Sequence, residues 1–222
     1  MDMKKIISLI LISSLLGMTA YFVLEAEIIK AQSSDTVIVT QAVSAEITIS
    51  APADITMSSA IPGITGNLGN PTTGSVSWTI TTNNVQGYNL KLKAAAAPAL
   101  SLDATWNFSD YSPATTVAPD FTWASPAASV AEFGFTVEPA TIADTDPFFK
   151  DDGVACNTGT ANAVDKCWWN FATTDKQIVN RSTETTSSGE AVAVKVRAES
   201  NAKYLKEGNY TATITATATM NP

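Results

Sequence analysis

The stretch Asn209-Tyr-Thr-Ala-Thr-Ile-Thr-Ala-Thr-Ala-Thr-Met220 decides the fold class of this chain. Successive side chains of a β-strand point to opposite faces, so strict alternation predicts a half-buried strand. Threonines cover the outer face of this strand. Its inner face carries Tyr210, Ala212, Ile214, Ala216, Ala218 and Met220.

The same period of two recurs in earlier parts of the chain. The segments that carry it are Val76–Ile80, Tyr88–Leu92, Phe133–Val137 and Val192–Val196. Asn83-Asn84 and Gln86-Gly87 stand between the first two segments, and these turn residues predict an antiparallel hairpin. The longest predicted strand is Thr36–Ser50, which is rich in valine, isoleucine and threonine.

Helical periodicity is missing from the sequence after Gln32, and the alanine run that begins at Ala94 ends at Pro98. Strands separated by Gly-, Pro- and Asn-rich turns predict an all-β, antiparallel, immunoglobulin-like β-sandwich. We expect a single domain over residues 32–222. A long insertion, at about residues 98–188, decorates it.

The N-terminus predicts export. Lys4-Lys5 precedes an apolar run from Ile6 to Leu24, which is the pattern of a signal peptide over residues 1–31. We expect cleavage after Ala31. Because the run is nearly long enough to span a bilayer, an uncleaved membrane anchor is the alternative. Either way the domain is expected outside the cytoplasm, secreted or at the cell surface.

Composition excludes several functions. The net charge of −8, with no basic stripe, disfavours nucleic-acid binding. The chain has no histidine, which removes the usual general base and the triads built on it. A carboxylate pair can hydrolyse a glycoside. However, the sequence pairs none of Glu132, Glu138, Glu190 and Glu199, so we expect no enzyme.

Cys156 and Cys167 are the two cysteines of the chain. In an oxidising compartment such a pair predicts a disulfide that closes a short loop. A metal site needs further ligands, and no histidine supplies them.

Aromatic residues of the insertion suggest a ligand platform. Exposed indoles bind the faces of sugar rings, with polar neighbours that fix orientation. The alternative is that these rings form a core beneath the insertion and pack on the cysteine pair. The candidate platform residues are Trp106, Trp123, Trp168 and Trp169.

A group of aspartates suggests calcium, the one cofactor we consider. Oxygen-rich turns chelate this ion, although the spacing of an EF-hand is not met. A solvated acidic loop is the alternative. The candidate ligands are Asp144, Asp146, Asp151 and Asp152.

The chain resembles the small secreted β-sandwich proteins of bacteria, distantly the WxL-domain surface proteins. The likeness rests on Ile47–Met57, on Ser77–Asn84 with Gly87-Tyr88, and on Gly208–Thr217. The two Trp-x-Leu signatures of that family are absent as written, and their closest matches are Trp106-Asn-Phe108 and Trp169-Asn-Phe171. The resemblance implies an exported surface sandwich, and this departure argues against attachment to peptidoglycan.

Together these patterns predict an exported, non-enzymatic structural or adhesion protein of the cell surface. Its partner is expected to be an envelope component, another protein or a second copy. The Thr36–Ser50 strand either pairs with a neighbouring subunit's sheet edge or covers an edge of its own domain. The alternative function is a carbohydrate-binding module that uses the aromatics of the insertion.

Overall fold

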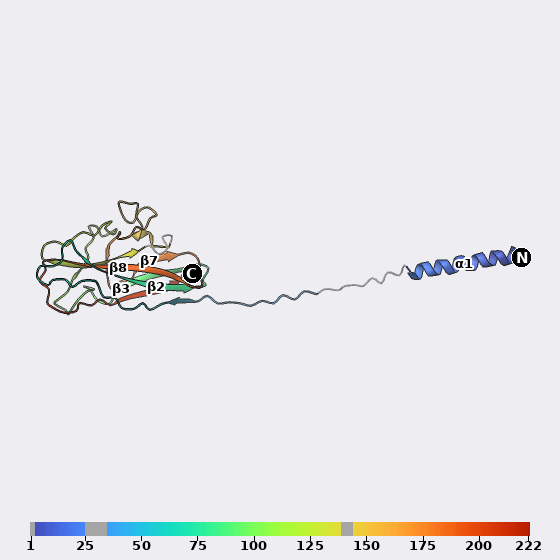
Figure 1. Cartoon of the computed structure of the whole chain (residues 1–222), viewed down its shortest axis with the longest axis horizontal. Coiled ribbons are helices and arrows are strands. Elements are labelled where there is room, and N and C mark those ends of the chain that lie inside the picture. Colours follow the sequence, from blue (N-terminus) through green and yellow to red (C-terminus); the bar gives the residue numbers. More distant parts are fainter. Residues whose placement is uncertain (1–2, 25–34, 139–143) are drawn as a thin grey trace. The chain divides into compact units, whose positions relative to one another are not determined.

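The structure, a computed structural model, describes residues 3–24, 35–138 and 144–222. The chain divides into two compact units, residues 1–43 and 44–222. The first unit contains the helix α1 (Met3–Leu24), and the second contains every described strand (Figure 1). The expected cleavage site at Ala31 lies outside the described residues. Among those residues, no helix combines the length and apolarity needed to cross a membrane.

The larger sheet has the order β1-β2-β8-β5-β4, and β6 also pairs with β5. All of its pairings are antiparallel except that of β4 with β5, which is parallel. The strands are β1 (Ile47–Ile49), β2 (Thr72–Thr82), β4 (Ser109–Asp110), β5 (Val130–Glu138), β6 (Trp169–Asn170) and β8 (Glu190–Asn201).

The smaller sheet has the order β7-β3-β9 and is antiparallel throughout. Its strands are β3 (Tyr88–Ala94), β7 (Lys176–Arg181) and β9 (Ile214–Met220). A single turn of 3-10 helix, η1 (Pro147–Phe149), is the one short helix described in this unit. The prediction of an all-β, antiparallel protein is confirmed.

One hydrophobic core joins the two sheets. Ile80 of β2 and Leu90 of β3 are completely buried, and Phe135 of β5 is nearly so. The apolar face that the period of two predicted for each of these strands points toward the shared core, and β5 is buried on both faces from Phe133 to Val137. The insertion adds Cys156 and Cys167 to the core cluster.

The predicted hairpin is wrong, although both of its strands exist. β2 pairs with β1 and β8, whereas β3 pairs with β7 and β9, so the connection crosses from one sheet to the other. Its turn is nevertheless tight, with Gly87 N–H donating to Asn84 O at 2.8 Å. Gly87 has φ of +76°, and a Cβ there would collide with the backbone oxygen of Arg181. Turn residues predicted the bend but not which strands it separates.

The predicted Thr36–Ser50 strand is also wrong, because only Ile47–Ile49 is a strand. Ile47 pairs with Thr82, the last residue of β2, so the chain before Ile47 runs past the end of its partner strand. Within the described residues 35–46 the backbone forms no strand. A sequence that favours a strand still needs a neighbouring strand to pair with.

Candidate functional site

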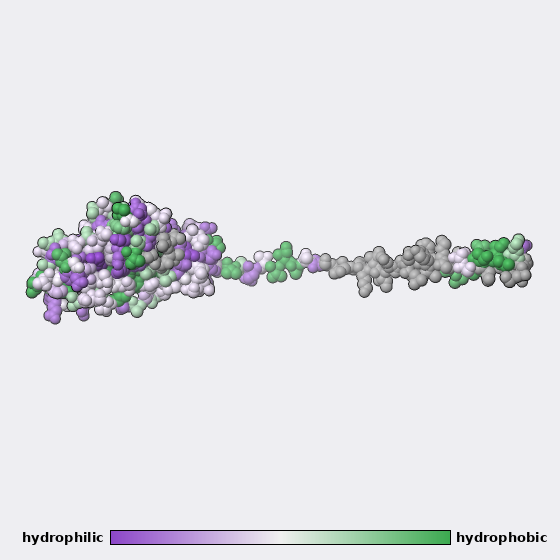
Figure 2. Space-filling model, turned by 45° about the horizontal axis from the view of Figure 1, so that its top comes forward, coloured by the Kyte–Doolittle hydropathy of each residue, from purple (hydrophilic) through white to green (hydrophobic). Residues whose placement is uncertain are grey.

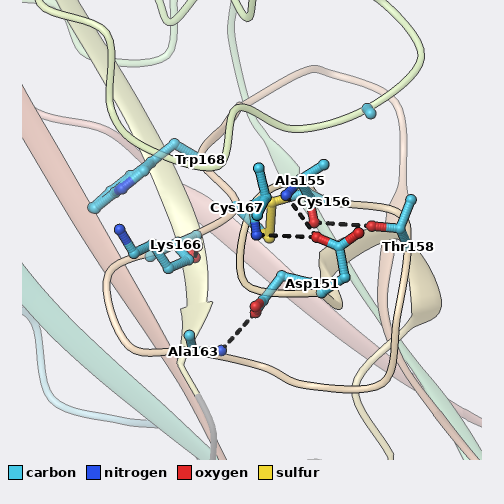
Figure 3. Close-up of a disulfide and its surroundings, with 12 residues drawn as sticks. Asp151, Ala155, Cys156, Thr158, Ala163, Lys166, Cys167 and Trp168 are labelled. Carbon is cyan, nitrogen blue, oxygen red and sulfur yellow. Dashed lines mark hydrogen bonds between the residues drawn. A yellow bond between two sulfur atoms is a disulfide. The ribbon is translucent and has the colours of Figure 1, made fainter.

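The disulfide between Cys156 and Cys167 is confirmed, with the two Cα atoms 5.6 Å apart (Figure 3). The loop around it is organised by the buried carboxylate of Asp151. This carboxylate accepts hydrogen bonds from Gly153 N at 3.0 Å and from Ala163 N at 2.8 Å. The bridge and the carboxylate together fix a segment that has no strand longer than two residues between Lys150 and Phe171.

The four aspartates do not form the predicted calcium site. Asp144 accepts from Arg181 Nη1 at 2.5 Å, and Asp146 caps η1. Asp151 and Asp152 each accept from backbone N–H groups of their own loop, and these bonds lower the pKa of Asp152 below its usual value. Over the described ranges no group of three acidic, cysteine or histidine side chains is placed to hold a metal ion. The prediction fails because a separate donor takes up each carboxylate.

The four tryptophans do not form one exposed platform. Trp168 is only 1% exposed, and its indole NH donates to Asp165 O. Trp123 meets Trp168 edge-on, with ring centroids 5.3 Å apart. Trp169 follows Trp168 on the opposite side of the chain and packs against Phe148 instead, at 4.8 Å. These three rings therefore pack against other aromatic rings of the protein instead of sharing one exposed face.

Trp106 lies apart from the other three. It is half-buried and packs at a tilt against Tyr204, with ring centroids 5.7 Å apart. Tyr204 is 65% exposed, so this pair presents an aromatic surface to solvent.

A pair of glutamates, which the sequence left unpaired, comes together on β5 and β8. Glu132 and Glu199 are cross-strand neighbours, and Glu199 is completely buried. Glu199 accepts hydrogen bonds from Trp123 Nε1 at 2.7 Å and from Gly69 N at 2.6 Å. Burial raises the pKa of Glu132, and the negative charges of Glu199 and Asp120 add to that effect.

The aromatic rings above this pair complete a polar network. Tyr111 stacks on Trp123 at 4.2 Å, and its hydroxyl donates to Asp120 Oδ2 at 2.6 Å. Gly134 of β5 permits this approach, because a Cβ there would lie 2.7 Å from Cβ of Tyr111. Protein groups hold the Glu199 carboxylate on both of its oxygens, which is typical of a structural network rather than a reacting one.

A long groove lies on the other face of the larger sheet. It runs between residues 52–64 and residues 204–214 and has a volume of about 1380 Å³. Its floor is apolar and consists of inward-facing residues of the larger sheet. These are Val76 and Trp78 of β2, Phe133 of β5, and Val194, Val196 and Ala198 of β8.

The smaller sheet borders this groove only at Ile214 of β9, and β1 of the larger sheet lies close to β9. Among the described strands, β9 pairs with β3 on one side and with none on the other. The consequence is visible in burial, since Leu90 and Leu92 of β3 are buried whereas Ile214 and Ala216 of β9 are only half-buried. An edge strand with unpaired backbone groups is a template for a further strand.

These features define an all-β protein with one disulfide, an apolar groove on the larger sheet, and a smaller sheet in which β9 is an edge strand. No known protein family matches the chain, and neither does any curated protein or solved structure. The sequence pattern predicted β9. It could not show that β9 lies at an edge of the smaller sheet, because that depends on which strands pair.

Proposed function

We propose that this protein is an exported, non-enzymatic structural subunit of the bacterial cell surface that associates with further copies of itself. The observation that carries the proposal is that β9, an edge strand of the smaller sheet, has backbone pairing with β3 alone among the described strands. Proteins that work alone usually cover or charge such an edge. β9 instead carries uncharged alanine and threonine along its length.

Export is supported by the N-terminal pattern and by the disulfide. Lys4 and Lys5 stand at the start of α1, whose following residues are apolar, as in a leader segment. Disulfides persist mainly outside the cytoplasm. We assign the two sheets and their common core to an immunoglobulin-like sandwich, a fold widely used for surface proteins.

A non-enzymatic role is supported by the surroundings of Glu132 and Glu199, the two carboxylates best placed for acid–base catalysis. Glu199 is completely buried, and both of its oxygens accept from protein donors, Trp123 Nε1 and Gly69 N. The chain also lacks histidine. The buried carboxylate of Glu199 therefore stabilises the insertion rather than facing a substrate.

The test is intact-mass spectrometry combined with light scattering on protein recovered from its native envelope or growth medium. We expect a mass that corresponds to cleavage after Ala31 and to the loss of two hydrogens in the disulfide. We also expect particles much larger than one chain. A cleaved protein that scatters as a monomer at all concentrations would refute self-association. A full-length chain released only by detergent would refute the cleaved signal peptide.

A second candidate function rests on the Trp106–Tyr204 pair, whose exposed rings offer a small surface for a sugar. A glycan array separates the two candidates. Binding that is lost in Trp106→Ala, by a protein that stays monomeric, would favour the carbohydrate-binding module over the structural subunit.

A further inference from the structure

We propose that the groove on the larger sheet binds an uncharged, linear polysaccharide whose rings lie along Trp106, Tyr204 and Tyr210. This inference rests on the second candidate function, sugar binding at the Trp106–Tyr204 pair, and it extends that site from one pair of rings to a groove. It names the class of glycan and the residues of the chain that hold it.

Tyr204 joins the aromatic pair to the groove. Its ring centroid lies 5.7 Å from that of Trp106, and the same residue lines the groove. Tyr210 also lines the groove, and it packs edge-on against Phe108 with ring centroids 5.4 Å apart. Both tyrosines belong to the wall formed by residues 204–214. The aromatic surface therefore continues from Trp106 into the groove instead of ending at the pair.

The groove is shallow, and its shape favours a chain of flat rings. At its bottom Phe133 and Val194 are only 3% and 1% exposed, so packing closes the floor to a ligand. The walls are open, since Tyr204 is 65% exposed and Ile55, on the opposite wall, is 39% exposed. The volume of about 1380 Å³ exceeds that of ordinary small-molecule pockets, which hold roughly 300–1,000 Å³. A ligand that fills this groove is therefore extended and lies along the walls.

Hydrogen bonds hold the aromatic pair in place. Lys203 Nζ donates to Asn107 O at 2.7 Å. These two residues are the chain neighbours of Tyr204 and Trp106, so the bond links the two segments that carry the rings. Asp103 Oδ1 also accepts from Trp106 N at 2.9 Å, which fixes the turn before the indole. A surface that is held in place before binding loses less conformational freedom when a ligand arrives.

Aromatic faces and free polar groups together match the two aspects of a sugar. The faces of a sugar ring carry C–H groups that pack on aromatic rings, and its edges carry hydroxyls that need hydrogen-bond partners. The planes of Trp106 and Tyr204 are tilted by 55°, so neither ring covers the face of the other. Thr56 and Asn209 are exposed along the groove, and within residues 35–138 and 144–222 their side chains have no hydrogen-bond partner. Both side chains are therefore free to bond the hydroxyls of a glycan.

The charge along the groove disfavours an acidic polymer. Among the described residues that line it, two carboxylates and one ammonium are present, from Asp54, Glu207 and Lys206. The chain as a whole carries a net charge of −8. A polymer with regularly spaced carboxylates or phosphates would be repelled by this field, whereas an uncharged glycan is not.

A partner that is apolar throughout matches this surface less well. On the face of the unit that Figure 2 shows, hydrophobic patches are small and hydrophilic surface separates them. The groove wall is mixed in the same way, since apolar Ile55 stands beside exposed, polar Thr56. A membrane or an apolar protein surface needs a continuous apolar patch. A glycan, with apolar ring faces and polar edges, suits a mixed wall.

The experiment measures sugar binding to the mature exported protein by isothermal titration calorimetry. The probes are cellohexaose and chitohexaose, which are uncharged, together with their disaccharides and the acidic hexagalacturonate. We expect an uncharged hexasaccharide to bind at least about tenfold more tightly than its disaccharide, because it reaches from the aromatic pair into the groove. Hexagalacturonate should bind more weakly than either uncharged hexasaccharide, because its carboxylates meet the negative charge of the protein.

Two pairs of substitutions locate the bound glycan. Tyr204→Ala should weaken hexasaccharide binding at least about tenfold, whereas Phe121→Ala, at a half-buried ring outside the groove, should leave it within about twofold. Asn209→Ala should weaken binding about fivefold, as expected for one lost hydrogen bond. Asn180→Ala is its control, because Asn180 is also exposed but lies on β7 outside the groove. The melting temperature of each variant shows whether its domain is folded.

The outcomes separate this inference from the functions proposed above. If hexasaccharide and disaccharide bind equally, and Asn209→Ala binds as the wild type does, the groove is not used and this inference is wrong, while sugar binding at the ring pair stands. If hexagalacturonate binds most tightly, the class of glycan is wrong. If no sugar binds, this inference and the second candidate function both fail, and the self-associating structural subunit is not affected.

Discussion

Opening the Cys156–Cys167 bridge tests how the insertion is held together. The two cysteines are separated by 11 positions, so the closed loop contains about a dozen residues. The chain-entropy relation, 2.1 + 1.5R ln n, then gives a stabilisation of about 2.8 kcal/mol at 25 °C. For a chain of this length 1 kcal/mol shifts the melting temperature by about 2–4 °C, so reduction should lower it by about 6–11 °C.

This magnitude assumes that the folded loop survives reduction, and the structure supports the assumption. Asp151 holds Gly153 and Ala163 independently of the sulfur atoms, and both cysteines are buried. The reduced thiols should therefore stay in place. Most of the loss should come from the greater freedom of the unfolded chain.

The assay is urea unfolding of the mature protein in three forms: oxidised, reduced, and the double variant Cys156→Ser with Cys167→Ser. The reduced wild type keeps its sulfur atoms, so its difference from the oxidised form isolates the crosslink. Reductant should not change the double variant, which serves as the control. A loss below about 0.5 kcal/mol, or complete unfolding on reduction, would refute the reasoning.

Three further predictions concern the polar groups of the insertion. Asp151→Ala should cost about 1.5–3 kcal/mol in urea unfolding, because two backbone N–H groups lose a buried carboxylate, whereas Asp152→Ala at the exposed neighbour should cost less. Trp123→Phe should cost a similar 1.5–3 kcal/mol, because buried Glu199 loses its indole donor, and an unchanged unfolding midpoint would contradict this. The raised pKa of Glu132 means that its contribution to stability is complete below the usual glutamate value, about 4.3, and is lost as pH rises through the folded value. Glu132→Gln should therefore melt at a higher temperature than the wild type at neutral pH, and the difference should vanish near pH 4, as calorimetry across that range can check.

The alternation of side chains predicted the strands of the core but not their pairing. β5, β8 and β9 appear where the period of two placed them, because burial of one face produces that period directly. The predicted hairpin of Val76–Ile80 with Tyr88–Leu92 is wrong because both strands face the same core. Their side chains alternate in the same way whether the strands belong to one sheet or to two. The predicted strand Thr36–Ser50 is wrong because its partner strand β2 ends at Thr82, which pairs with Ile47. Residues 35–46 have no strand beside them, and their own sequence cannot show where β2 ends.

The candidate sites divide in the same way. The disulfide followed from the count and spacing of two residues, and the structure contains it. The platform and the calcium site failed because residues near in sequence, such as Trp168 and Trp169, point to different neighbours. The Glu132–Glu199 pair and the groove needed the register of β5 with β8 and the position of β9, neither of which composition or spacing encodes.

The single disulfide also limits how copies of this protein can be joined. The chain has two cysteines, and each is the other's partner, so no thiol remains to link one copy to the next. While the bridge is intact, a cystine bond between copies is excluded. An assembly of copies would then carry its covalent crosslinks inside its subunits. Its joints would form and dissolve by mass action, and a non-reducing gel run after full denaturation should return single chains.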